Sequence, residues 1–407
     1  MLNASSLRAA RAGAALSLLT AVGALAACND AKNATTGAVS STTGPSYAVD
    51  PRTTTDCARA TQNPAKVVCL ANAFLKTLST AQKDSVLVTL SSTNAVRWSN
   101  LPCGITCRNG ILFNQLNSTQ LAAALNVAKA ALSSAGYSQE EQHRIADSIL
   151  ATANTGGGGP PGGSPPGGTP PGGTPPSGTV GASATTSGYG AGVYIIAFLG
   201  TPSTTGKWIL QLGGHHLAIN IAYNGAATPY LTPYHTGIEP QKFTVNGVTY
   251  TPLQSRATAM YTLVNSLDSS QYAAASLSQT YTDMLLGAGE DARSLFPSPR
   301  QGIPGSRLTA AQRQLVKTAI EAWVKDFPST EANNALAAYE DASALDSTYV
   351  ASSGGRDSTK QGSYVRIDGP RVWIEFVCQN GVVYTNQIHF HTIWRDRTYD
   401  YGGFFSL

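Results

Sequence analysis

The chain has few charged residues, and the two signs nearly cancel. Lys, Arg, Asp and Glu make up 12% of its 407 residues, and the formal net charge at pH 7 is +4. Leaving out Arg8 and Arg11, the two charged residues of the first 27, lowers that charge to +2 (4 − 2). So small an excess gives no electrostatic reason to expect nucleic acid or an anionic membrane surface as a partner. With 42% apolar residues, the composition fits a globular protein.

Several motifs that would name a reaction are also missing. The sequence has no Gly-x-Ser-x-Gly, no phosphate-binding loop ending in Gly-Lys-Ser/Thr and no His-Glu-x-x-His. A glycine-rich run at 188–192 precedes an apolar stretch instead of following one, so it is not a dinucleotide-binding fingerprint. These absences leave the substrate, a small molecule or a polymer, undefined.

Long apolar runs are confined to the N-terminus. Residues 1–27 combine two arginines with an Ala/Leu/Val-rich stretch too short for a membrane span, which predicts a signal peptide. The stretch ends in Leu25-Ala26-Ala27-Cys28, which resembles a bacterial lipoprotein cleavage box and so implies acylation of Cys28. The alternative is an ordinary secretory signal with a chance cysteine. Residues 28–50, rich in Ala, Thr, Ser and Gly, predict a flexible tether.

This N-terminus predicts an exported lipoprotein, on the periplasmic face or the cell surface, that contacts the membrane only through its lipid anchor. Export places the remaining cysteines in an oxidising compartment. The pairs that are close in sequence are Cys57–Cys69 and Cys103–Cys107, although sequence alone does not fix connectivity. Cys378 is left over in a strand-like run and is interpreted as a small buried hydrophobe. A zinc-ligand pair at Cys103 and Cys107 is the alternative to a disulfide there.

A Pro/Gly-rich segment at 155–180 divides the remaining chain, but the halves on either side repeat each other. Each half has a helical Leu-x-x-x-Gln, then Arg-x-Gly-Ile, then a second helix that begins with a capping residue. In both halves the glycine of Arg-x-Gly-Ile and a glutamine of the second helix are ten residues apart, from Gly110 to Gln120 and from Gly302 to Gln312. Two similar helical units favour one core. We therefore expect a single domain over 51–407, interrupted by a disordered insertion at 155–180.

Apolar, extended segments lie between and after these helical units. They include 194–199, 208–224 and 382–394, and two hairpins with turns at Asn246-Gly247 and at Asp368-Gly369-Pro370. Grouped helices and grouped strands predict an α+β fold with a mainly antiparallel sheet and the two helical units packed around it.

Four of the six histidines stand in two strand-like runs. His389 and His391 are two residues apart, so their side chains share one face of a strand. His215 and His216 follow Gly213-Gly214; in a regular strand they face opposite ways, and we favour His216 as the third ligand. Three imidazoles around one point are typical of a transition-metal site, with zinc or copper as the ion.

Further residues are candidates for roles around that site. Glu375 is a candidate catalytic base or fourth ligand, with a structural ion pair to Arg366 or Arg371 as the alternative. Asp396 is a candidate for orienting an imidazole. Rim candidates for substrate contact are Gln211, His235, Trp394 and Arg395. His143 stands in a charged run and is expected on the solvated surface.

Several of these runs together resemble the domain-of-unknown-function 3500 family. The motifs are Trp208-x-x-Gln211-x-Gly213-Gly214-His215-His216-Leu217, Tyr364-x-Arg366-Ile367-x-Gly369-Pro370, Ile374-Glu375-Phe376, His389-x-His391-x-x-Trp394-Arg395-Asp396 with Asp400-Tyr401-Gly402, Arg97-Trp98 and Arg108-x-Gly110-Ile111. They cover residues 65 to 405. The Pro/Gly insertion and the N-terminal cysteines depart from the pattern. The resemblance implies one exported domain and no particular activity.

The residues predict three alternative functions. The first is an exported metal-dependent hydrolase, because three imidazoles and an open position suit Zn²⁺ and a bound water. The second is a copper-dependent oxidoreductase, because imidazole suits copper equally well. The third is a surface lipoprotein that binds a ligand or a metal without catalysis.

Overall fold

A computed structural model describes residues 57–60, 63–154, 188–288 and 296–405. The predicted signal peptide (1–27), the predicted acylation site Cys28, the predicted tether (28–50) and the Pro/Gly-rich segment lie outside these residues. None of the described helices is long and apolar enough to cross a membrane.

The core element is an eleven-stranded sheet to which residues on both sides of the 155–187 segment contribute. Its order is β1-β3-β4-β5-β6-β13-β12-β11-β10-β9, with β2 also paired to β3. All the pairings are antiparallel except that of β1 with β3. The strands are β1 (Leu87–Val88), β2 (Ile111–Leu112), β3 (Ile195–Leu199), β4 (Lys207–Gly214), β5 (Leu217–Asn224), β6 (Tyr234–Ile238), β9 (Ile303–Pro304), β10 (Tyr349–Ser353), β11 (Tyr364–Asp368), β12 (Val372–Asn380) and β13 (Ile388–Asp396).

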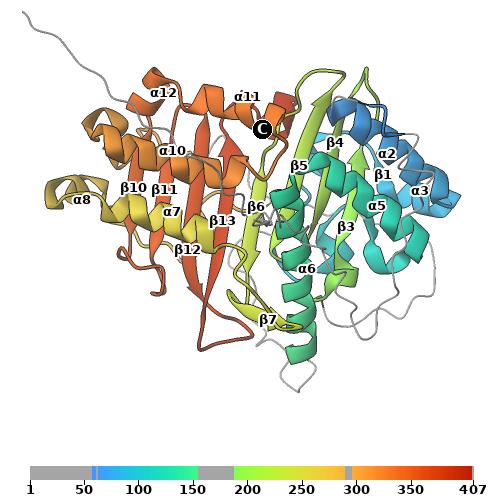
Figure 1. Cartoon of the computed structure of the whole chain (residues 1–407), viewed down its shortest axis with the longest axis horizontal. Coiled ribbons are helices and arrows are strands. Elements are labelled where there is room, and N and C mark those ends of the chain that lie inside the picture. The colour runs from blue at the N-terminus through green and yellow to red at the C-terminus, as the bar shows by residue number, and fades with distance from the viewer. Residues whose placement is uncertain (1–56, 61–62, 155–187, 289–295, 406–407) are drawn as a thin grey trace, which may run out of the picture. The chain divides into compact units, whose positions relative to one another are not determined.

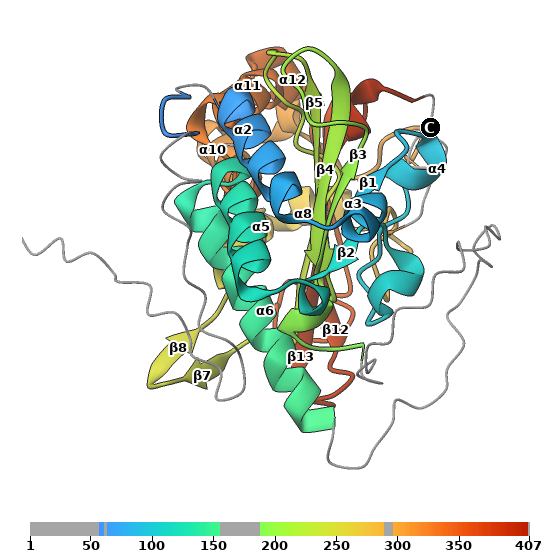
Figure 2. The ribbon, with the colours of Figure 1, turned by 90° about the vertical axis from the view of Figure 1, so that its right-hand side faces the viewer.

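Helices cover one face of this sheet. Figure 1 shows α2, α5 and α6 in front of β3–β5, and α7 and α10 in front of β10–β13; Figure 2 shows α2, α5, α6 and α10 on one side of the strands. The helices are α2 (Asn63–Thr77), α3 (Thr80–Val86), α4 (Ser92–Ala95), α5 (Ser118–Ala131), α6 (Ser134–Asn154), α7 (Gln254–Asn265), α8 (Ser269–Ala275), α10 (Ala310–Val324), α11 (Ser329–Tyr339) and α12 (Ala342–Asp346). The fold is therefore α+β with a mainly antiparallel sheet, as predicted.

The two faces of the sheet have different covers. Because side chains alternate along a strand, Ile196 and Phe198 pack into the helix-side core, while Ala197 and Leu199 pack into a second cluster on the other face. Loop residues, including Trp98, Tyr281, Met284 and Tyr401, cover that second face. We call it the loop face.

The predicted repeat of the helical units is present at atomic detail. Gln82 and Gln120 bond to each other through their side-chain amides, and so do Gln271 and Gln312. In each pair the second glutamine also completes the capping box of its own helix, on Asn117 in α5 and on Thr309 in α10. The two units pack on opposite halves of one sheet.

Gly110 and Gly302 are the matching glycines of these units. Each has a positive φ, +96° and +108°, and in each a Cβ would lie 2.3 Å from a strand carbonyl oxygen. A side chain fits at neither position, so both units need glycine for the same close approach to the sheet.

Two smaller predicted hairpins are also confirmed. Asn246 and Gly247, both with positive φ, connect β7 (Phe243–Val245) to β8 (Val248–Tyr250). The Asp368-Gly369-Pro370 turn lies between β11 and β12, which pair antiparallel.

The cysteines pair as the short sequence separations suggest. Disulfides link Cys57 to Cys69 and Cys103 to Cys107, so the zinc-ligand alternative for the second pair was wrong. Cys378 is a buried free thiol 3.2 Å from the Tyr261 hydroxyl. Burial raises the pKa of this thiol to about 12, which keeps it protonated and unreactive.

Candidate metal centre

The turn between β4 and β5 carries the first histidine pair. The segment 208–224 is extended as expected except at its middle: Gly214 pairs with Leu217, which leaves His215 and His216 as a two-residue hairpin turn. His216 has a φ of +62°, which is uncommon for a residue other than glycine. Because the pair is not in a strand, the two imidazoles do not face opposite ways but stack, with ring centroids 3.7 Å apart.

Polar partners fix the backbone of this turn on every side. The Arg108 guanidinium donates to the Gly214 carbonyl at 2.8 Å, and the Tyr194 hydroxyl donates to the His215 carbonyl at 3.0 Å. His216 donates its N–H to the Asn100 carbonyl at 3.1 Å and accepts from the Gly237 N–H at 2.6 Å. So complete a set of bonds holds His216 in its left-handed conformation.

His389 and His391 reach the same point from β13. Both lie on the loop face, and Gly237 of β6 stands opposite His391 in the ladder. A Cβ on Gly237 would lie 2.8 Å from Cδ2 of His391 and 3.0 Å from Cδ2 of His216. The missing side chain therefore creates the space in which the turn histidine meets the strand histidines.

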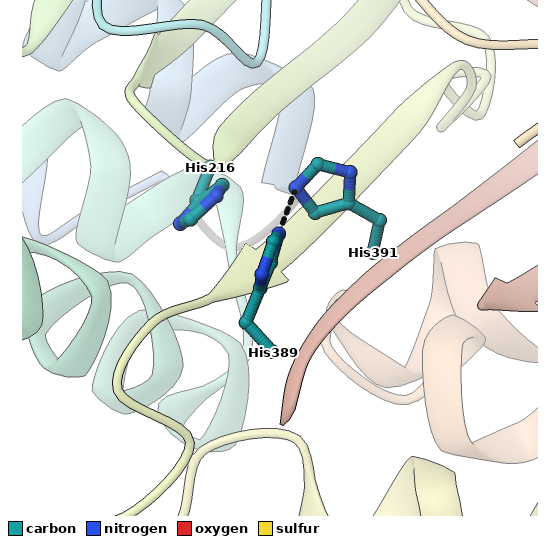
Figure 3. A group of neighbouring side chains, drawn as sticks. All are labelled: His216, His389 and His391. Carbon is teal, nitrogen blue, oxygen red and sulfur yellow. Dashed lines mark hydrogen bonds between the residues drawn. The ribbon is translucent and has the colours of Figure 1, made fainter. Parts of the chain in front are cut away.

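These three imidazoles form the one group within the described residues that has metal-binding geometry. One ligand nitrogen from each of His216, His389 and His391 lies within 4.8 Å of the other two, and all three side chains are buried (Figure 3). The Nε2 atoms of His389 and His391 are 3.2 Å apart. Two nitrogens bound tetrahedrally at about 2.0–2.1 Å from one ion lie about 3.3 Å apart, so this pair already has the required separation.

The chain matches one family model over residues 60–403, described as a protein of unknown function (DUF3500). It belongs to the DUF3500 family. No curated protein and no solved structure matches it. The family assignment confirms the sequence resemblance, and it leaves the chemistry of this DUF3500 protein to be argued from the site.

Asp283 orients one of the three imidazoles in this DUF3500 chain. His391 donates from Nδ1 to the Asp283 carboxylate at 3.0 Å, which leaves the Nε2 lone pair directed at the shared point. Although burial opposes it, the interaction with His391 lowers the pKa of Asp283 to about 2. The carboxylate is thus ionised at any physiological pH, while its side chain remains half exposed.

Burial keeps the imidazoles of His216 and His389 neutral. It lowers the pKa of His389 to about 3, with a further contribution from His391, and it holds the pKa of His216 well below the usual range. Neutral imidazole is the form that binds a metal ion. His216 and His389 can therefore bind an ion at pH 7 without first losing a proton.

The other three histidines of the DUF3500 chain lie around the trio. His215 donates from Nδ1 to Asp147 at 2.7 Å. His235 has its ring centroid 5.6 Å from that of His391 and is fully buried, with no partner for either ring nitrogen. His143 is buried too, so its expected surface position was wrong. It lies within α6 on the packed side of the helix, where it donates from Nδ1 to the Gln139 carbonyl at 2.7 Å.

Glu375 lies on the loop face, but its side chain holds a loop in place and does not join the three histidines. Its carboxylate accepts bonds from the Leu285 and Leu286 N–H groups at 2.6 and 2.9 Å, and from Trp373 and Tyr364. Arg395 bonds the Leu286 and Gly287 carbonyls at 2.8 and 2.6 Å. These contacts fasten residues Tyr281–Ala288, which we call the strap, and the strap carries Asp283 to His391. Within the described residues, Arg371 pairs with Asp396 and Arg366 bonds Gln301, so neither forms the alternative ion pair with Glu375.

The structure does not bring the remaining candidates to the trio. Asp396 and Trp394 lie on the opposite face of β13 from His389 and His391, and Asp396 bonds Arg371 and Tyr339. Gln211 is buried, and its amide links Asn109, the Ala95 carbonyl and Asn220. Sequence reasoning missed Asp283, Asp147 and Gly237, and no pattern around these three distinguishes them from ordinary loop, helix and strand residues.

Proposed function

We propose that this chain is an exported, lipid-anchored, metal-dependent hydrolase whose ion is bound by His216, His389 and His391. The observation that carries the proposal is the meeting of three buried imidazoles within 4.8 Å, one of them oriented by a carboxylate. A zinc ion with three histidine ligands keeps a fourth position and lowers the pKa of a water bound there to about 7. The two disulfides support the export part of the proposal, because such bonds form in oxidising compartments.

The residues around the ion have separate tasks in this proposal. Asp283 holds His391 in the tautomer that presents Nε2. The bonded turn holds His216, and Gly237 leaves it room. The strap carries Asp283, whose half-exposed side chain marks the side from which water and substrate reach the trio. The strap, which includes Met284, covers the loop face and limits solvent at the site. Limited solvent strengthens electrostatic interactions inside the site.

Metal analysis of the purified protein is the first test. We expect about one equivalent of zinc, lost in His216→Ala, His389→Ala and His391→Ala. His143→Gln, which removes a buried histidine outside the trio, is the matched control and should retain the ion. A metal-free protein whose thermal midpoint does not respond to added zinc or to a chelator would sink the proposal.

Activity then separates the three functions. A hydrolase should cleave members of an ester and phosphoester panel, lose that activity in chelator and regain it with zinc. One equivalent of copper with oxygen consumption would favour the oxidoreductase, since imidazole ligands also suit copper. A bound ion without turnover on any substrate would favour a metal-binding surface lipoprotein.

A further inference from the structure

Three arginines surround one aspartate at the far end of β11–β13. Asp368 Oδ1 accepts a bond from Arg397 Nη2 at 2.5 Å and lies 3.3 Å from Arg300 Nε. The guanidiniums of Arg366 and Arg397 both lie against the Trp373 ring, 5.0 and 5.7 Å from its centroid. The Asp368 carboxylate thus faces three positive charges, while Glu375 adds a second negative charge near Arg366.

Within the part of the chain that the structure describes, several buried polar atoms of this group have no hydrogen-bond partner. They are Nε and Nη1 of Arg366, Nε of Arg397, Nε of Arg300 and Oδ2 of Asp368. Arg366 is fully buried, and its one side-chain hydrogen bond to a described residue goes to Gln301 at 3.1 Å. Leaving a buried charged donor unsatisfied is costly, so a group of them indicates a missing acceptor.

The electrostatics of Arg397 reflect its burial first and its charged neighbours second. Burial lowers the pKa of Arg397, and the neighbouring Arg300 and Arg366 lower it further, against the opposing effect of Asp368. The group is reachable from solvent, because the side chains of Arg300 and Arg397 are 31% and 16% exposed.

We propose that Arg300, Arg366 and Arg397 bind a hydrogen phosphate group, with Asp368 accepting its proton-bearing oxygen. Three guanidiniums offer charge-assisted bonds to the phosphate oxygens. The unpartnered Asp368 Oδ2 needs a donor, and a protonated phosphate carries one, whereas sulfate at neutral pH does not. Asp368 thereby selects among oxyanions of similar size.

This site is independent of the proposed metal centre. Arg397 lies six residues beyond His391, which along a strand is about 20 Å. An experiment can therefore refute the phosphate site without refuting the metal site, and the reverse also holds.

Calorimetric titration of the full chain tests the proposal, with inorganic phosphate, glycerol phosphate, sulfate and acetate at matched ionic strength. We expect saturable phosphate binding, at least tenfold tighter than that of sulfate or acetate. Arg300→Gln and Arg397→Gln should each weaken it about tenfold; Arg300 is the most exposed of the three, so its replacement is the least able to disturb the fold. Arg313→Gln, the same change at an exposed arginine paired with Asp346, is the control and should bind normally.

The titrations have outcomes that support the site and outcomes that contradict it. Tighter binding of glycerol phosphate than of inorganic phosphate bears out the site with an ester as its ligand, and the reverse order bears it out with the free ion. Asp368→Asn should abolish the preference over sulfate. Equal binding of sulfate and phosphate to the unaltered protein, no saturable binding, or the same loss in Arg313→Gln would overturn the assignment.

Discussion

At the scale of single residues, the histidines show what spacing predicts and what it misses. His389 and His391 are two apart, so their common face follows from strand geometry alone. His216 could not be placed from sequence, because the two-residue turn that directs it depends on how β4 pairs with β5. His143 was misplaced because charged neighbours on α6 suggested a solvated surface, whereas the helix buries the opposite side.

Asp283 should control metal affinity without supporting the fold. Asp283→Asn removes the charge that orients His391 and should weaken zinc binding by about 10- to 100-fold. Its side chain is half exposed, so the thermal midpoint of the metal-free protein should stay nearly constant. Competition titration with a chromophoric chelator measures the affinity, and Asp357→Asn, in the connection between β10 and β11, is the control. Unchanged affinity would remove Asp283 from the site.

His143 should make the stability of the metal-free protein depend on pH. Burial lowers its pKa to about 4, below the value of about 6.5 in an unfolded chain. The unfolded state therefore binds the extra proton first, and stability is lost as the pH falls through this window. Between pH 7 and pH 5 this group alone should cost about 2 kcal/mol.

His143→Gln removes that titration and provides the comparison. Denaturant unfolding of both proteins in chelator should show their difference in unfolding free energy shift by about 2 kcal/mol in favour of the variant between pH 7 and pH 5. A difference that stays constant with pH would contradict the buried, neutral state of His143.

At the scale of elements, the repeated helical units were the most predictable part of the fold. Capping residues and matched Gln spacings are local signals, and the paired amides of Gln82 with Gln120 and Gln271 with Gln312 explain why both spacings are kept. The strap was not predictable, because the bonds that hold it come from β12 and β13, far along the chain. The sequence suggested Glu375 and Arg395 as residues of the site itself. In the structure their side chains bond the strap and so hold it in place.

Glu375→Gln should loosen the strap. The amide keeps one acceptor oxygen but turns a donor toward either the Leu285 or the Leu286 N–H group, which should cost about 3 kcal/mol of stability. Hydrogen exchange at these two amides should accelerate at least tenfold, and zinc affinity should fall as Asp283 moves. Glu321→Gln, at a largely exposed ion pair, is the control. Lost activity with unchanged exchange and stability would instead make Glu375 the catalytic base that the sequence suggested.

At the scale of the whole molecule, the sheet requires residues from both sides of the 155–187 segment. β2 comes before it and pairs with β3 after it, and α2 and α5 pack on strands that follow it. Composition predicts that the segment cannot contribute to a core, but only the pairing shows that the parts it connects form one sheet. Because of that pairing, we expect the described domain to unfold in a single cooperative transition.

Deleting residues 160–178 tests this expectation. The connection shortens from roughly 33 to roughly 14 residues, which changes the loop-closure free energy by only about 0.8 kcal/mol. Calorimetry should therefore show one unfolding transition in both proteins, with the midpoint of the deletion variant equal or slightly higher. Because β3 loses its partner β2 if the parts separate, two transitions in the intact protein would mean that the halves fold independently and that this strand pair is dispensable.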